Sequence, residues 1–132
     1  MGLNDTYTGF SDIEIKASLN ELSRLCHSRN ERWYRNPATG EETGTNDGEK
    51  FMLMVSEIAE AMEGHRKGLA DDKLPHRPMV EVELADALIR IFDYAGWRGL
   101  DIGGALVEKM EYNRTREDHT DAARIKAGGK KY

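Results

Sequence analysis

One segment constrains this chain more than any other. Residues 80–97 read VEVELADALIRIFDYAGW, which is apolar or aromatic at most positions yet contains three carboxylates besides Glu81. At about 100° per residue, a helix here is apolar around most of its circumference, as buried helices are. Glu83, Asp86 and Asp93 share one wedge of that helix with Arg90. The sequence therefore predicts a buried helix with one acidic strip, which needs compensation because burying charge is costly.

The preceding apolar segment repeats this arrangement. It reads FMLMVSEIAEAMEGHRKG and places Glu57 and Glu60 three residues apart, on neighbouring faces of a helix. Four clustered carboxylates, these two with Glu83 and Asp86, require either raised pKa values or a cation among them. Oxygen ligands alone favour Mg²⁺ or Mn²⁺. The alternative is that all four are solvated residues at the edges of apolar faces, with Asp86 paired to Arg90 one turn later.

The distribution of helix start and stop signals predicts an all-α fold, a bundle of four helices. Ser11 opens a capping box, SDIE, and Asp47 is expected to cap the second helix. Gly68 is a stop signal, Pro78 suits a first helical turn, and Asp101 can cap the last helix. The expected helices cover about 11–33, 47–67, 78–97 and 102–116.

Length and composition limit the class of protein. The chain has 132 residues, which suits one domain over residues 1–132, with a core at about 11–116 and a polar tail at 117–132. It has no apolar run of about 18 residues and no secretory pattern at its start, so we expect no membrane association. A lone cysteine, Cys26, fits the cytoplasm. The net charge of -5 argues against general nucleic-acid binding.

The last expected helix changes character along one face. After Ile102, Ala105 and Leu106, the same face continues with Lys109, Asn113 and Arg116. Two cations and an amide at such spacing suit phosphate oxygens. The alternative is an ordinary helix end, where basic residues interact favourably with the helix dipole.

Taken together, these motifs resemble a known family. EIAE is followed after a spacer of 22 residues by ELAD and then by KMEYNRTR. This order resembles the MazG-type all-α nucleoside triphosphate pyrophosphohydrolases, particularly their short, single-domain, phage-encoded members, from about Leu22 to the C-terminus. The resemblance implies two sets of site residues. The metal-binding and catalytic set is Glu57, Glu60, Glu83 and Asp86, and the phosphate-binding set is Lys109, Asn113 and Arg116.

The resemblance also implies an activity and an assembly. A Mg²⁺ ion, for which Mn²⁺ can substitute, would help water to hydrolyse a (d)NTP to the (d)NMP and pyrophosphate. The bundle would form a homodimer or homotetramer, in the host cytoplasm if the chain is phage-encoded. Some relatives act on modified nucleotides, alarmones or dUTP, so the base is left open. Some also carry an acid where this chain has Ser56, which leaves the general base unassigned.

Three further residues are candidates for contact with the substrate. Trp33 ends the first expected helix, where a base can stack on its ring. Arg66 and Lys67 follow the first acid pair and can reach phosphates. The alternatives are an aromatic cap on the core and an ordinary basic helix end. For the chain as a whole, the alternative function is a non-enzymatic helical module that binds a partner.

Overall fold

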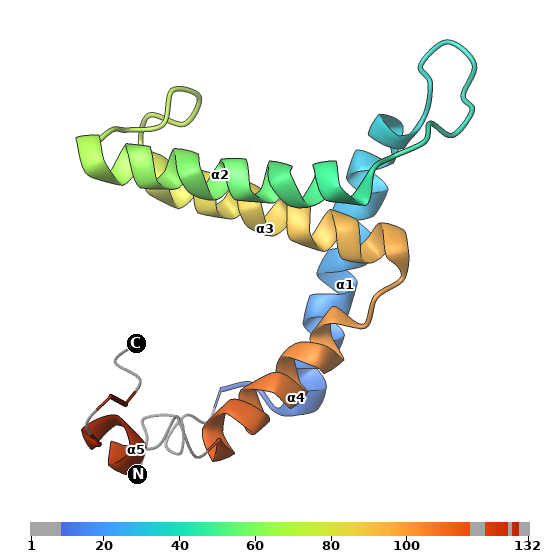
Figure 1. Ribbon diagram of the computed structural model, residues 1–132. Coiled ribbons are helices and arrows are strands. Elements are labelled where there is room, and N and C mark those ends of the chain that lie inside the picture. Colours follow the sequence, from blue (N-terminus) through green and yellow to red (C-terminus); the bar gives the residue numbers. More distant parts are fainter. Residues whose placement is uncertain (1–8, 117–120, 127, 130–132) are drawn as a thin grey trace. The chain divides into compact units, whose positions relative to one another are not determined.

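The computed structural model describes residues 9–116, 121–126 and 128–129, and in these ranges the chain is all-α, as predicted. Within them there is no strand, and two isolated β-bridges join Arg35 to Glu42 and Ala70 to Pro78. No described helix has the length and apolar character needed to span a bilayer. The elements are α1 (Asp12–Asn30), η2 (Glu31–Tyr34), α2 (Asp47–Lys67), α3 (Met79–Arg98), α4 (Ile102–Thr115) and α5 (Asp121–Ile125), shown in Figure 1.

Most of the expected helix boundaries are confirmed by their capping groups. The Ser11 hydroxyl accepts from the Glu14 backbone N–H at 3.2 Å and so begins α1. Gly68 and Gly99 end α2 and α3 in the left-handed conformation, with φ of 62° and 64°. Glycine has no Cβ to oppose this conformation, so the chain can reverse at both points. Asp101 accepts from the N–H three residues further on, at 2.9 Å, and begins α4.

Two further boundaries and one segment differ from the prediction. The first helix ends at Asn30, and the following turn, Glu31–Tyr34, is a 3₁₀ helix, the tighter form common at helix ends. Pro78 immediately precedes α3 rather than lying in its first turn. In the segment expected to be a polar tail, Asp121–Ile125 forms the short helix α5. Such a five-residue element gives little periodicity in the sequence.

The start of α2 also corrects the prediction. Asn46, not Asp47, is the N-cap, and its side chain accepts from the Glu49 N–H at 3.2 Å. The Asp47 carboxylate accepts instead from the Tyr94 hydroxyl at 2.8 Å and from Arg98 Nε at 3.0 Å. Because both donors lie on α3, these bonds fix the beginning of α2 to the end of α3.

The chain forms two compact units, and Glu21–Leu100 is one of them. In this unit α2 and α3 pack side by side as an antiparallel hairpin (Figure 1). Small residues allow close approach: a Cβ at Gly96 of α3 would lie 2.3 Å from the Ser23 carbonyl oxygen of α1. At the loop end of the hairpin, a Cβ at Gly64 would lie 2.7 Å from Met79 Cγ. The Met79 N–H also donates to the Leu69 carbonyl at 2.9 Å.

The other unit contains the described residues up to Asn20 and from Asp101 onward. Asn20 links its two segments, because its amide donates to Asp101 Oδ1 and accepts from the Gly103 N–H, both at 2.8 Å. A Cβ at Gly103 would lie 2.4 Å from the Lys16 carbonyl oxygen, so this glycine permits the backbone contact of α4 with α1.

An apolar stripe on the hairpin stays exposed in the single chain, although the sequence predicted that the third helix is buried. On α3, Leu84 is 45 % exposed and Leu88 is 52 % exposed. The physical reason is that a single hairpin covers one side of each helix. Four of the exposed apolar residues on α2 recur at intervals of four, three and four, the spacing of one helix face. They are Phe51, Val55, Ile58 and Met62.

Candidate metal centre

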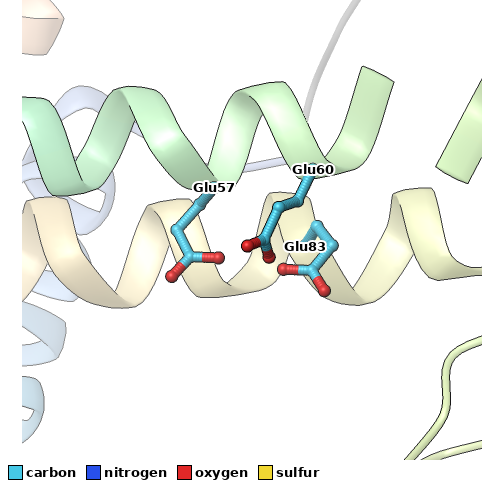
Figure 2. Close-up of side chains that lie close together, drawn as sticks. All are labelled: Glu57, Glu60 and Glu83. Atoms are coloured by element: carbon cyan, nitrogen blue, oxygen red, sulfur yellow. The ribbon is translucent and has the colours of Figure 1, made fainter. Parts of the chain in front are cut away.

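The hairpin brings together three carboxylates from two segments. Glu57 and Glu60 lie one turn apart on α2, and Glu83 lies opposite them on α3. One carboxylate oxygen from each of the three lies within 4.8 Å of the others. Figure 2 shows the three side chains pointing toward one another from the two paired helices. The antiparallel packing therefore turns two separate sequence motifs into one group of oxygen ligands.

Burial makes it costly for all three of these carboxylates to be ionised. Glu57 is buried, Glu60 is exposed, and Glu83 is partly buried. The Glu83 Oε2 atom is shielded from solvent and, within the described ranges, has no hydrogen-bond partner. Burial, followed by the Glu57 and Glu60 carboxylates, raises the pKa of Glu83 to about 8. An ionised carboxylate here requires a positive charge, and without one the favoured form is protonated.

Asp86 is the fourth predicted ligand. It lies one turn after Glu83 and is partly buried, but it is not part of the close group of three. Burial and then the Glu57 carboxylate raise the pKa of Asp86, which Arg90 opposes. Asp86 therefore belongs to the same electrostatic environment as the group of three.

Asp71 adds an acid that the sequence analysis did not single out. This buried residue lies in the loop between α2 and α3, and its charge also raises the pKa of Asp86. Asp71 Oδ2 accepts from the backbone N–H groups of Lys73 and Leu74, at 3.0 and 2.8 Å. Its hydrogen bonds shape the loop. The sequence signal, an aspartate at the start of a turn, indicates only that local role.

Arg90 does not pair with Asp86, the partner that helix spacing suggested. Instead of Asp86 on its own helix, its Nε donates to Glu57 Oε1 across the hairpin at 2.8 Å. The pair links α3 to α2 at the carboxylate group. An intrahelical spacing rule could not identify this partner, because Glu57 is 33 residues away in sequence.

Asp93 does not contribute to the expected acidic strip, because other side chains bind its carboxylate. The Tyr34 hydroxyl donates to Asp93 Oδ2 at 2.9 Å, and His27 Nδ1 donates to Oδ1 at 3.0 Å. Burial, and then the bond to Asp93, raises the pKa of Tyr34. This buried carboxylate is satisfied by two donors, so it stabilises the packing of α1 and η2 on α3.

The three additional candidates lie on the surface of the same unit. Trp33 is 65 % exposed, with the Arg32 guanidinium 4.8 Å above its ring. Arg66 and Lys67 both pair with Glu63, at 3.2 and 2.6 Å. Their charges are therefore partly compensated within the last turns of α2.

The predicted phosphate residues lie in the other unit. Lys109 is exposed on α4, and its ammonium lies 4.7 Å from the centre of the Tyr112 ring. Arg116 follows the last residue of α4, with its guanidinium 5.7 Å from the same ring. The Asn113 side-chain oxygen is shielded and, among the residues described, lacks a hydrogen-bond partner. An amide oxygen accepts hydrogen bonds and does not bind an anion, so the phosphate-binding role of this face stays a prediction.

The raised pKa of Glu83 predicts a pH dependence of stability in EDTA. The folded protein binds this proton more tightly than the unfolded chain, whose carboxyl titrates near 4.5. The resulting stabilisation is complete below pH 4.5 and is lost as the pH rises through about 8. Urea titrations should show the free energy of unfolding falling over this range, and Glu83→Gln should reduce the slope. Glu108→Gln, the same change at an exposed site, should keep it. An undiminished slope in Glu83→Gln would contradict the assignment.

The donor set defines what the centre can do chemically. Three carboxylates on two paired helices, with a fourth one turn away, can hold a hard divalent cation through oxygen. An ion held in this way can in turn bind oxygens of a phosphorylated ligand. Comparison of the chain with protein-family models, with curated proteins and with solved structures finds no match.

Proposed function

We propose that this chain is a metal-dependent nucleotide pyrophosphohydrolase that converts a (d)NTP to the (d)NMP and pyrophosphate. The observation that carries the proposal is the convergence of Glu57, Glu60 and Glu83 on the α2–α3 hairpin. The resemblance of EIAE, ELAD and KMEYNRTR to the MazG-type motifs supplies the reaction class. A structural role alone would leave the cost of gathering these acids without a compensating benefit.

The donor atoms fit Mg²⁺, with Mn²⁺ as a substitute. Glu83 Oε2 is a shielded oxygen that lacks a described partner, and the other donors are carboxylates as well. Glu57, Glu60 and Glu83 would hold the ion, with Asp86 as the fourth ligand. The bound ion supplies charge neutralisation for the triphosphate and activation of water.

The remaining proposed roles belong to side chains that bind the substrate. Lys109, Asn113 and Arg116 donate to the phosphates, where a planar guanidinium can bind two oxygens at once. Trp33 offers an exposed ring to the base, and Arg66 and Lys67 are further phosphate donors. Ser56 does not replace the missing acid, because its hydroxyl donates to the Leu53 carbonyl at 2.7 Å.

The position of bond cleavage is tested with a panel of canonical and modified (d)NTPs and Mg²⁺ or Mn²⁺. We expect pyrophosphate as a product, because the attacked atom is the α-phosphorus. In ¹⁸O-labelled water the label should then appear in the monophosphate. Release of orthophosphate alone would contradict the proposed reaction, and the panel also identifies the preferred base.

Substitutions in the carboxylate group test the metal centre itself. Glu60→Gln and Asp86→Asn should abolish or severely reduce turnover, yet leave the metal-free protein as stable as wild type or more stable, because each removes like-charge repulsion. The wild type should gain about 2.7 kcal/mol from Mn²⁺ at a hundredfold excess over Kd, and the variants much less. Thermal melts with and without Mn²⁺ measure both effects.

A matched control is Glu49→Gln, the same chemical change in the exposed first turn of α2. It should keep both turnover and the stabilisation by Mn²⁺. If Glu60→Gln melts lower without metal and retains the full metal response, the carboxylates are structural and the metal centre is wrong.

We also propose a homodimer or homotetramer. The exposed stripe Phe51, Val55, Ile58 and Met62 is an apolar helix face of the kind that packs against another helix. Burying it requires a specific interface of at least roughly 1,000 Å². Light scattering at micromolar concentration should give a multiple of the chain mass, and Ile58→Glu should shift it toward the monomer. A wild-type monomer would contradict the assembly.

A second candidate function follows from the same stripe. An exposed apolar face also suits a non-enzymatic module that binds a partner helix. The two functions give opposite results in the nucleotide panel, since a binding module has no turnover with any (d)NTP and no dependence on Glu60.

A further inference from the structure

The proposed reaction assigns no role to Arg90, although this residue contacts the carboxylate group. Its Nε donates to Glu57 Oε1 at 2.8 Å, within the group of carboxylates. The two side chains differ in exposure, 11 % for Glu57 and 41 % for Arg90. The carboxylate is thus fixed and enclosed, whereas the guanidinium reaches it from the surface.

The pairing is electrostatically incomplete. One guanidinium faces Glu57 directly, and Arg90 also lies one helical turn after Asp86 on α3. Glu60 and Glu83 belong to the same group. A single positive charge cannot neutralise this group of carboxylates, so a divalent cation in it would compete with Arg90 for Glu57.

We propose that Arg90 exchanges Glu57 for a phosphate of the substrate when the divalent cation binds. The inference rests on the proposed function and assigns a further substrate-binding residue to it. The bound cation takes over the charge of Glu57, which weakens the hold of that carboxylate on the guanidinium. Arg90 then becomes a phosphate donor directly beside the metal ligands.

The position and chemistry of Arg90 suit this exchange. It lies one helical turn after Asp86, so its side chain is adjacent to the metal group on the same face of α3. Its stem is long and partly exposed, and a change of rotamer can redirect the head without moving the helix. The planar fork of donors matches phosphate oxygens better than a point charge does.

The exchange predicts opposite changes in two affinities. In Arg90→Gln, Mn²⁺ should bind about tenfold more tightly without nucleotide, because its competitor is gone, a difference of about 1.4 kcal/mol. Inorganic tripolyphosphate should bind the Mn²⁺-loaded protein about tenfold more weakly, because a phosphate donor is gone. Electron paramagnetic resonance of free Mn²⁺ and calorimetry measure the two affinities.

Arg98→Gln is the matched control. Arg98 also joins α3 to α2 through a carboxylate, Asp47, and its loss removes the same charge outside the metal group. Both affinities should stay close to wild type in this variant. If both variants bind Mn²⁺ more tightly to the same extent, the effect is one of net charge, and the exchange is overturned.

The outcomes separate this inference from the proposed function. A wild type that binds no Mn²⁺ and cleaves no (d)NTP overturns the proposed function. A wild type that does both, together with Arg90→Gln that binds Mn²⁺ no more tightly, overturns the exchange alone. If Arg90→Gln does not fold, Arg90→Lys keeps the charge without the fork. It should retain Mn²⁺ affinity and bind tripolyphosphate more weakly, and unchanged tripolyphosphate affinity would overturn the proposed contact.

Discussion

The antiparallel pairing of α2 with α3 is the constraint on which the rest of the structure depends. It places oxygens of Glu57, Glu60 and Glu83 within 4.8 Å of one another. Two full charges at that separation repel by roughly 3 kcal/mol at an effective dielectric constant of about 20. Summed over three pairs, this repulsion is comparable to the roughly 5–15 kcal/mol stability of an ordinary domain. The three carboxylates cannot all remain ionised and uncompensated.

The structure contains two responses to this repulsion, and they point to the same chemistry. One is protonation, since the pKa of Glu83 is raised to about 8 by burial and by its acidic neighbours. The other is the Arg90 guanidinium on Glu57. Both leave the group short of positive charge at neutral pH, which a divalent cation would supply. The proposed pyrophosphohydrolase uses that same ion for its substrate.

The sequence predicted what depends on local chemistry and on helix periodicity. Gly68 ended α2 as expected, because a left-handed residue needs no distant partner. The partners of Asp93 could not be predicted, because Tyr34 and His27 lie 59 and 66 residues away. Periodicity identifies the face on which a side chain lies, and only the tertiary packing determines what it meets there.

The same limit applies to the candidate site. The spacing within EIAE and ELAD indicated the acids, and the folded hairpin brought three of them together. The spacing gave no indication that Arg90 would bind Glu57 on the other helix, since an intrahelical partner was equally compatible with the sequence. What covers the apolar faces of α3 could not be predicted for a similar reason. Helix periodicity predicts how much apolar surface a helix has. It does not predict whether the same chain packs against that surface.

The attachments at the two ends of the hairpin determine how it can deform. At one end Asp47 binds both Tyr94 and Arg98, and at the other Met79 is bonded to Leu69 and packed against Gly64. The repelling carboxylates lie between these points. Because the helices are fastened at both ends, a change of charge in the carboxylate group can displace the middle of the pair more readily than either end.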